Sequence, residues 1–321
     1  MLESFKIADL GCSSGPNTLL FVSEIIDTIN KLSKQNSNKT QEISVILNDL
    51  TKNDFNNIFS ALPSFYELLK KNHGYEFSRK CFISGVAASF YERLVPCKSL
   101  HFVHSSYCLH WLSQVPENLE NKEHIYMSKT RDPNVFNAYK NQFYKDFSSF
   151  LTHRSHEILP TGRMVLTLVG RESPDPSEDD GCHVIELLAQ SLLDVVSQGL
   201  IKQEDIDSFN LPVYHPCKDE VKEIIHNENS FDLEKLEVFE CDWNPHDNDY
   251  GDGDYNYKFD KKQRGEIVAN SVRSIIEPTL VPHFGELVLD NVFKSYEERA
   301  IDHFETGKAK YINLIICLKK K

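Results

Sequence analysis

The sequence predicts an α/β protein built on a doubly wound, mostly parallel sheet. Apolar, strand-like segments alternate with amphipathic, helix-like segments along almost the whole chain, which is typical of this fold class. The first strand-like segment also leads directly into a glycine-containing turn that opens a helix. The 321 residues are 40% apolar and 11% aromatic and show no internal repeat. We therefore expect a single domain over residues 1–321 with a sizeable core.

Seven runs of residues have the length and composition of strands, and most of them are apolar. The first ends at the glycine turn, and the second ends in an acidic residue. In chain order the runs are 6–10, 43–50, 81–86, 100–105, 163–169, 233–241 and 311–318.

Helices are predicted between these strands where apolar residues recur at three- and four-residue spacing. The first helix begins at Pro16 or Asn17, because proline is tolerated in a first helical turn. Pro63 is expected to interrupt the second helix. The predicted helices cover 17–32, 54–69, 133–159, 182–198, 218–226, 263–276 and 285–300, with helical insertions after the fourth and fifth strands.

Composition narrows the class of partner to a small molecule. A net charge of −13 argues against nucleic acid, and no apolar run approaches the roughly 18 residues of a membrane span. Eight cysteines without C-x-x-C spacing, and a start that lacks signal-peptide features, indicate reduced thiols in the cytoplasm. The acidic stretch DNDYGDGDY (247–255) does not match an EF-hand loop, so we expect a solvated insertion there.

The sequence IADLGCSSGPN carries the strongest functional signal. Gly11 and Gly15 are four residues apart, which differs from the G-x-G-x-x-G of dinucleotide-binding proteins. A strand ending in D-x-G-x-x-x-G is the pattern with which Rossmann-like methyltransferases bind S-adenosylmethionine. Asp9 is predicted to accept hydrogen bonds from this cofactor, with Cys12 and Asn17 lining the turn. The structural alternatives are that Asp9 is a loop-capping carboxylate, that Cys12 is a buried thiol and that Asn17 is a helix N-cap.

Two further positions fit such a cofactor. Asp49 ends the second strand, where an acidic residue binds ribose hydroxyls in related folds. Ser89 and Phe90 follow the third strand and offer a hydroxyl and an aromatic face to an adenine ring. The alternatives are that Asp49 is an exposed strand-end carboxylate, that Ser89 is a turn residue and that Phe90 belongs to the core.

Polar-tipped aromatic residues follow the fourth strand. Tyr107, His110 and Trp111 would lie at the carboxyl edge of the sheet, where ligands bind in such folds, and they suit a small planar substrate. The indole N–H of Trp111 could donate to a carboxylate or carbonyl oxygen, and a core anchor is the alternative. His101 and His104 are three residues apart on a strand and face opposite sides, so we expect both to be structural.

Seven motifs in order resemble the plant SABATH methyltransferases, and the resemblance covers essentially the whole chain. That family includes salicylate, benzoate and jasmonate carboxyl methyltransferases and the N-methyltransferases of the caffeine pathway. The motifs are IADLGCSSGPNTL, VILNDLTKNDFNNIFSALP, ASFYERLVP, LHFVHSSYCLHWLSQVPENL, GRMVLTLVGRES, SFNLPVY and EPTLVPHFGE.

The resemblance implies a class I methyltransferase fold with a seven-stranded sheet and an α-helical cap from insertions near 112–131 and 172–230. It implies S-adenosylmethionine as methyl donor, and the family is often dimeric. The implied cofactor contacts are Asp9, Cys12, Asn17, Asp49, Leu50, Ser89 and Phe90. The implied catalytic and substrate contacts are Tyr107, His110 and Trp111, with Val169, Ile185, Tyr214, Val272 and Tyr311 shaping the pocket. Some members bind a metal ion, at positions matching Asn121, Asp207, Phe209 (by its carbonyl) and Asn210 here, an oxygen set that suits Mg²⁺.

Two departures from the family pattern bear on function. Family chains begin well before the first strand, with a segment that contributes to both pockets, so an impaired, truncated remnant is one hypothesis. Salicylate-selective members carry Met, Trp and Met where this chain has His110, Ile185 and Val272, so we do not expect strict salicylate selectivity. The leading hypothesis is a carboxyl methyltransferase, which needs no general base because a carboxylate is ionised at pH 7. An N-methyltransferase acting on a xanthine is the alternative.

Overall fold

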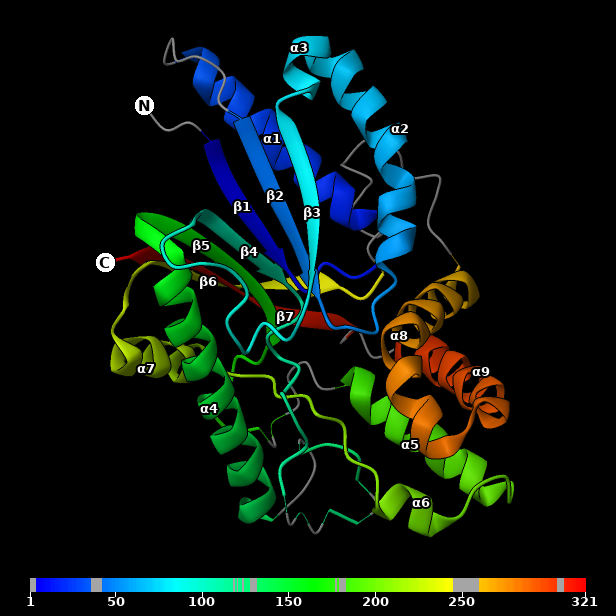
Figure 1. Cartoon of the computed structure of the whole chain (residues 1–321). Helices are drawn as coiled ribbons and strands as arrows, with labels where there is room; N and C mark the ends of the chain where they lie inside the picture. Colours follow the sequence, from blue (N-terminus) through cyan, green and yellow to red (C-terminus); the bar gives the residue numbers. More distant parts are fainter. Residues whose placement is uncertain are drawn as a thin grey trace.

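The structure is a computed structural model, and it describes residues 4–35, 42–117, 119, 121–122, 124–127, 132–176, 178, 183–244, 260–304 and 309–321. Within these residues the chain forms one seven-stranded sheet (Figure 1). The strands are β1 (Ser4–Leu10), β2 (Glu42–Asp49), β3 (Cys81–Ala87), β4 (Leu100–Ser106), β5 (Ile158–Gly170), β6 (Phe231–Asp242) and β7 (Lys310–Lys320).

The strand order is β3-β2-β1-β4-β5-β7-β6. The first five strands are parallel, and β7 pairs antiparallel to both β5 and β6. The order reverses between β1 and β4, so the carboxyl ends of these two strands flank the switch point where ligands bind in doubly wound sheets. The predicted mostly parallel, doubly wound sheet is confirmed.

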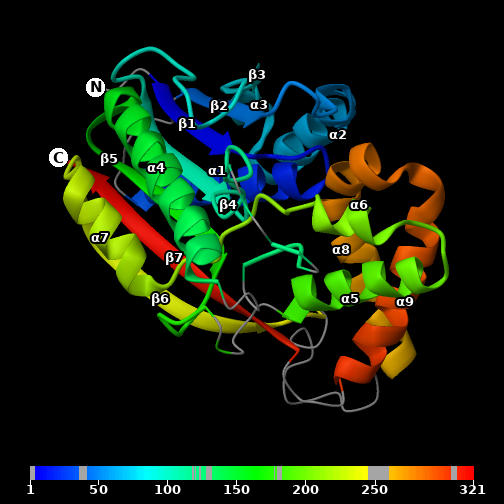
Figure 2. The ribbon, with the colours of Figure 1, turned by 90° about the horizontal axis from the view of Figure 1, so that it is seen from below.

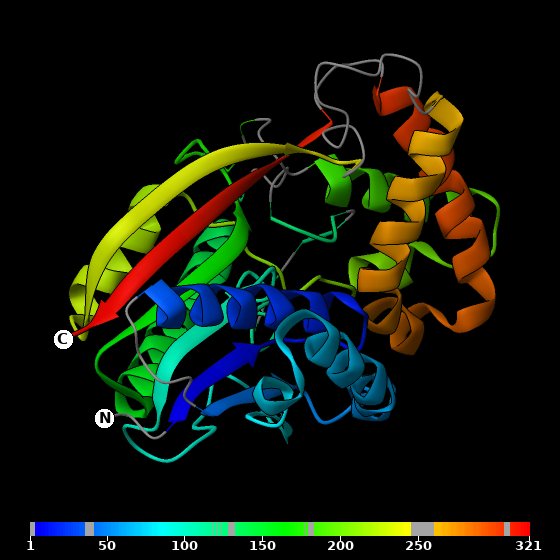
Figure 3. The same ribbon diagram turned by 90° about the horizontal axis from the view of Figure 1, so that it is seen from above.

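Helices cover both faces of the sheet. Figures 2 and 3 show α1 (Asn17–Gln35) and α2 (Phe55–His73) on one face and α4 (Pro133–Glu157) and α7 (Lys218–Glu228) on the other. The buried apolar residues accordingly form two clusters, a smaller one under α1, α2 and α3 and a larger one that includes residues of the helices from α4 to α9. The helices are α1 (Asn17–Gln35), α2 (Phe55–His73), α3 (Tyr75–Ser78), α4 (Pro133–Glu157), α5 (His183–Ser197), α6 (Gln203–Asp207), α7 (Lys218–Glu228), α8 (Lys261–Phe284) and α9 (Glu286–His303).

A separate helical layer lies beyond the carboxyl ends of the parallel strands (Figure 1). Here α9 packs against both α5 and α8, and α6 contacts α5. The insertion predicted over 172–230 includes α5 and α6, but it also includes α7, which packs on α4 and β6. The layer thus differs in extent from the predicted cap, because α8 and α9 belong to it and α7 does not.

Three predicted helix boundaries are wrong. Helix α2 continues through Pro63, which is exposed, so water can bond to the carbonyl that the missing proline N–H leaves free. Helix α8 likewise continues through Pro278 and Pro282. Helix α4 stops earlier than predicted, because Ile158 already pairs with Leu100 of β4 as the first residue of β5.

Candidate active site

The glycine turn between β1 and α1 is fixed by the end of β2. The backbone N–H groups of Gly11 and Cys12 both donate to the carbonyl of Asn48, at 2.8 and 2.9 Å. Gly11 has a φ of +78°, and a Cβ added there would lie 2.2 Å from the Cys108 sulfur. Glycine is therefore required at this position both for its backbone conformation and for the close approach of the segment that follows β4.

Asp49 connects β2 to the same turn. Its Oδ2 accepts from the backbone N–H of Ser13 at 2.7 Å, and its Oδ1 accepts from the N–H of Leu50 at 2.7 Å. Each carboxylate oxygen can accept a second hydrogen bond, so these contacts leave capacity for ribose hydroxyls. Leu50, the next residue, is exposed.

Two asparagines also hold the turn, Asn53 just before the N-cap of α2 and Asn57 in its first turn, and the sequence analysis missed them. Asn53 Nδ2 donates to the Ser13 carbonyl at 3.1 Å, and Asn57 Nδ2 donates to the Ser14 carbonyl at 2.8 Å. The signal was their position directly after a strand that ends at the ligand-binding edge of the sheet. They satisfy carbonyls that a tight turn leaves without helical or sheet partners.

Asp9 lies buried at the carboxyl end of β1. Its Oδ1 pairs with His104 Nδ1 of β4 at 2.8 Å, and the His104 ring stacks on Phe21 of α1 with centroids 3.6 Å apart. His101 has a separate partner, because its Nδ1 accepts from the backbone N–H of Lys6. The two histidines thus have different environments, as predicted from their spacing.

The other residues of the turn differ in exposure. Cys12 is buried, and burial together with the carboxylates of Asp49 and Asp9 raises the pKa of its thiol, which stays protonated at neutral pH. Asn17 is exposed and begins α1.

The segment after β3 approaches the turn from the other side. The Ser89 hydroxyl accepts from the backbone N–H of Tyr91 at 3.3 Å. The Phe90 ring packs edge-on against Phe150 of α4, with centroids 6.0 Å apart, and its Cε1 lies 3.6 Å from the position of a Gly11 Cβ. Ser89 and Phe90 therefore lie beside the glycine turn.

The segment after β4 carries Tyr107, His110 and Trp111. Tyr107 has a φ of +57°, and its backbone N–H donates to the Thr167 carbonyl of β5 at 2.7 Å. The thiol of Cys108 donates to the Gly11 carbonyl at 3.2 Å, so this segment touches the glycine turn directly.

A second segment, residues 211–214, runs alongside the first. Trp111 forms a β-bridge with Val213, and the Tyr214 N–H donates to the His110 carbonyl at 2.8 Å. The backbone thus fixes the three predicted acceptor contacts from both sides.

His110 is buried beside a second histidine that the sequence analysis did not single out. The ring of His215 lies edge-on to that of His110, with centroids 5.8 Å apart. Burial lowers the pKa of His110 to about 3, and burial, His110 and the Arg171 cation lower that of His215 well below its usual range. Both imidazoles are neutral at pH 7.

Most of the residues predicted to shape the substrate pocket lie in or against the larger buried apolar cluster. Ile185, Tyr214 and Val272 belong to one buried apolar cluster, against which Trp111 and Tyr311 pack. Burial and the neighbouring Tyr107 raise the pKa of Tyr311 to about 12, so its hydroxyl is uncharged. Val169 lies buried near the end of β5.

The Tyr214 hydroxyl is hydrogen-bonded to the ion pair of Glu220 and Arg171. It donates to Glu220 Oε1 at 2.8 Å, which also receives Arg171 Nη2 at 2.8 Å. Tyr214 therefore presents its ring rather than its hydroxyl to this cluster.

Comparisons with known proteins identify the family of the chain. A family model for SAM-dependent carboxyl methyltransferases matches residues 1–321. The chain belongs to this family. Probable jasmonic acid carboxyl methyltransferase 2 of Theobroma cacao is 47% identical over 334 residues, covering 100% of this chain and 87% of the relative. S-adenosyl-L-methionine:benzoic acid/salicylic acid carboxyl methyltransferase 3 of Petunia hybrida is 46% identical, covering 99% and 86%.

A solved structure of a loganic acid methyltransferase with SAH superposes with a TM-score of 0.82 at 34% identity, covering 99% of this chain and 85% of that chain. The predicted SABATH resemblance and the class I methyltransferase fold are thereby confirmed. S-adenosylmethionine is the cofactor of this carboxyl methyltransferase family, and the β1–α1 turn lies where such folds bind it.

The metal positions implied by the family form a hydrogen-bonded group. Asn121 Nδ2 donates to Asn210 Oδ1 at 2.9 Å, which also accepts from the Tyr139 hydroxyl, while Asp207 Oδ1 accepts from Gln203. These bonds engage oxygens that a cation would need. Among the described residues no group of three or more His, Cys, Asp or Glu could hold a metal ion.

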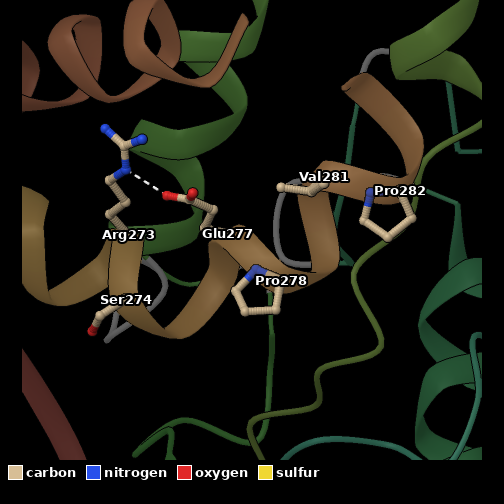
Figure 4. Close-up of a pocket in the computed structure, with 6 residues that line it drawn as sticks. All are labelled: Arg273, Ser274, Glu277, Pro278, Val281 and Pro282. Carbon is tan, nitrogen blue, oxygen red and sulfur yellow. Dashed lines mark hydrogen bonds and ion pairs between the residues drawn. The ribbon is translucent and has the colours of Figure 1, made fainter. Parts of the chain in front are cut away.

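A separate pocket lies along α8. It is lined by Arg273, Ser274, Glu277, Pro278, Val281 and Pro282, and contains an Arg273–Glu277 ion pair (Figure 4). None of the predicted site residues lines it. In the same described part of the chain, every helix is too short or too polar to cross a bilayer. The predicted acidic insertion (247–255) lies outside the described residues.

Proposed function

We propose that this protein transfers the methyl group of S-adenosylmethionine to the carboxylate of a small plant acid of the jasmonate, benzoate or salicylate type, giving a methyl ester. The observation that carries the proposal is the direct contact between the two halves of the site, where Cys108 of the acceptor segment donates to the Gly11 carbonyl of the cofactor turn. The jasmonate and benzoate/salicylate carboxyl methyltransferases named above support the class of acceptor.

The chain's residues would mainly bind and align. S-adenosylmethionine, when bound, supplies a methyl group on a positively charged sulfur that leaves as a neutral thioether. The acceptor carboxylate is already ionised, so no residue needs to remove a proton. The buried, neutral His110 is too weak a base for that task and would instead orient the acceptor, with Tyr107. The Trp111 indole N–H would hold one carboxylate oxygen while the other attacks the methyl carbon.

The test is product analysis with methyl-labelled S-adenosylmethionine. Purified protein is incubated with jasmonic, salicylic, benzoic and loganic acids and with xanthines, and the products are identified by mass spectrometry. We expect labelled methyl esters from at least one acid, and no label transfer to the preformed methyl esters, which lack a carboxylate. Label on a xanthine nitrogen, or on none of these compounds, would contradict the proposal.

Trp111→Phe separates acceptor binding from cofactor binding. This change removes the indole N–H but keeps an aromatic ring, so we expect esterification to fall at least roughly tenfold. Affinity for S-adenosylhomocysteine should stay within about twofold of the original protein, since the proposed donor contacts lie elsewhere.

Three finer points remain proposals. We propose the cytoplasm as the location and a homodimer as the assembly, the latter to be tested by sedimentation at several concentrations. Mg²⁺ binding at Asn121, Asp207, Phe209 and Asn210 stays a prediction, which metal analysis of the purified protein would check.

A further inference from the structure

The segment of residues 89–95, which follows β3, is held by a buried ion pair on α4. Arg154 and Glu157 are both fully buried, and Arg154 Nε lies 2.7 Å from Glu157 Oε2. Arg154 donates from Nη1 to the Phe90 carbonyl at 2.8 Å and from Nη2 to the Glu92 carbonyl at 2.7 Å. Charge-assisted hydrogen bonds at these distances are strong, so Arg154 fixes the backbone at Phe90.

Glu157 fixes the other end of the 89–95 segment. Its Oε1 accepts from the backbone N–H groups of Leu94 and Val95, at 2.6 and 3.2 Å. The Ser149 hydroxyl of α4 also donates to the Tyr91 carbonyl at 3.2 Å. Because α4 holds the backbone at several points, the remaining freedom of this segment lies mainly in its side chains.

One of these side chains reaches the acceptor segment. The Tyr91 hydroxyl donates to the Trp111 carbonyl at 2.7 Å. Burial raises the pKa of Tyr91 well above its usual range, so the hydroxyl keeps its proton. The Tyr91 ring also packs edge-on against Phe90, with centroids 4.8 Å apart. A chain of two contacts thus joins Phe90, beside the cofactor turn, to Trp111.

We propose that Tyr91 is a positioning residue that couples cofactor binding to the geometry of the acceptor site. An adenine held by Ser89 and Phe90 restricts the Phe90 ring, which restricts the Tyr91 ring, whose hydroxyl fixes the backbone of Trp111. The inference rests on the proposed function, because it takes Phe90 as a cofactor contact and Trp111 as an acceptor contact. The coupling is reciprocal, so acceptor binding strengthens cofactor binding by the same factor.

The first test uses S-adenosylhomocysteine alone, so it does not depend on knowing the acceptor. The chain has two tryptophans, Trp111 and Trp243, and a Trp243→Phe background leaves Trp111 as the fluorescent reporter. We expect S-adenosylhomocysteine to change Trp111 emission in this background. Adding Tyr91→Phe should remove most of that change, while the calorimetric Kd for S-adenosylhomocysteine stays within about twofold, since its direct contacts remain.

The second test measures coupling with an acceptor. For the acid that the product analysis identifies, Tyr91→Phe should raise the acceptor Kd in the presence of S-adenosylhomocysteine by roughly tenfold, as expected for one lost neutral hydrogen bond. Without S-adenosylhomocysteine the change should be smaller. A merely structural role would weaken acceptor binding equally in both conditions.

Tyr144→Phe is the matched control. It removes one tyrosine hydroxyl bond, from α4 to Glu223 of α7, at 2.7 Å, and it should alter neither the emission change nor the coupling. The proposal is overturned if Trp111 emission does not respond to S-adenosylhomocysteine, or responds equally in Tyr91→Phe. If no acid is methylated, the proposed function fails, while the fluorescence measurement still decides whether Tyr91 links the two segments.

Discussion

Replacing Gly11 by alanine should destabilise the cofactor turn by about 2–5 kcal/mol. The φ of +78° costs an L-residue about 1–2 kcal/mol. The new Cβ would also lie 2.2 Å from the Cys108 sulfur and 2.8 Å from its Cβ. Cys108 must therefore move, which breaks its hydrogen bonds to the Gly11 and Ser106 carbonyls. Overpacking of this kind costs about 1–3 kcal/mol.

The assay combines urea denaturation with calorimetric titration of S-adenosylhomocysteine. Gly11→Ala should lower the free energy of unfolding by the amount above and weaken cofactor binding. In the double variant with Cys108→Gly both overlapping atoms are gone, so only the cost of the positive φ should remain relative to Cys108→Gly alone. If the double variant recovers none of the loss, the steric part of the reasoning is refuted.

Three further outcomes are expected. Asp49→Asn exchanges an acceptor oxygen for an amide donor that faces a backbone N–H. The Kd for S-adenosylhomocysteine, measured by calorimetry, should therefore rise roughly tenfold. An unchanged Kd would contradict the role of Asp49 as a cofactor contact. The pKa of His215 is lowered in the folded state, so the stability that its neutral form contributes is complete above pH 6.5 and is lost as the pH falls. His215→Gln should therefore flatten the decline of the unfolding free energy between pH 6 and 5, by up to about 1.4 kcal/mol per pH unit. Parallel curves of unfolding free energy against pH for the two proteins would refute this expectation. Arg154→Met removes the closer of the two cations paired with the buried Glu157 and leaves only Arg93 Nε, at 3.5 Å. It should cost about 3–5 kcal/mol in urea denaturation, whereas Arg163→Met, at an exposed pair with Glu234, should cost under about 1 kcal/mol. Equal losses would contradict the role of burial.

The spacing of apolar residues along the chain predicted the positions of the strands and most helices. All seven strands were located. Those at the centre of the sheet are continuous apolar runs, as buried parallel strands usually are, whereas β6 is mostly exposed and carries Glu234, Lys235, Glu237 and Glu240. The boundaries failed where tertiary contacts or solvent decide them. Pro63 lies on an exposed helix face that tolerates a missing N–H, and Ile158 leaves α4 because β4 offers it a partner. Neither the exposure of Pro63 nor the pairing of Ile158 with β4 can be inferred from the neighbouring residues in the sequence.

The same division holds in the site. The sequence predicted the glycine turn, the strand-end Asp49 and the aromatic segment after β4 as parts of the site, since each is a short motif with its own chemistry. It missed Asn53, Asn57, His215 and the Arg154–Glu157 pair, which are ordinary residues until distant segments meet them. Arg154 is 64 residues from Phe90 in the chain, but its guanidinium bonds to the Phe90 carbonyl.

The sequence by itself determined that this chain has a turn of the kind that binds S-adenosylmethionine, because the need for glycine and for small residues is local. Only the tertiary structure decided that Cys108 closes against Gly11, that His110 is neutral, and that Tyr91 connects the two halves of the site. Those properties depend on burial and on contacts between segments far apart in the chain. They arise only when the sheet brings the carboxyl ends of β1, β2, β3 and β4 to one edge.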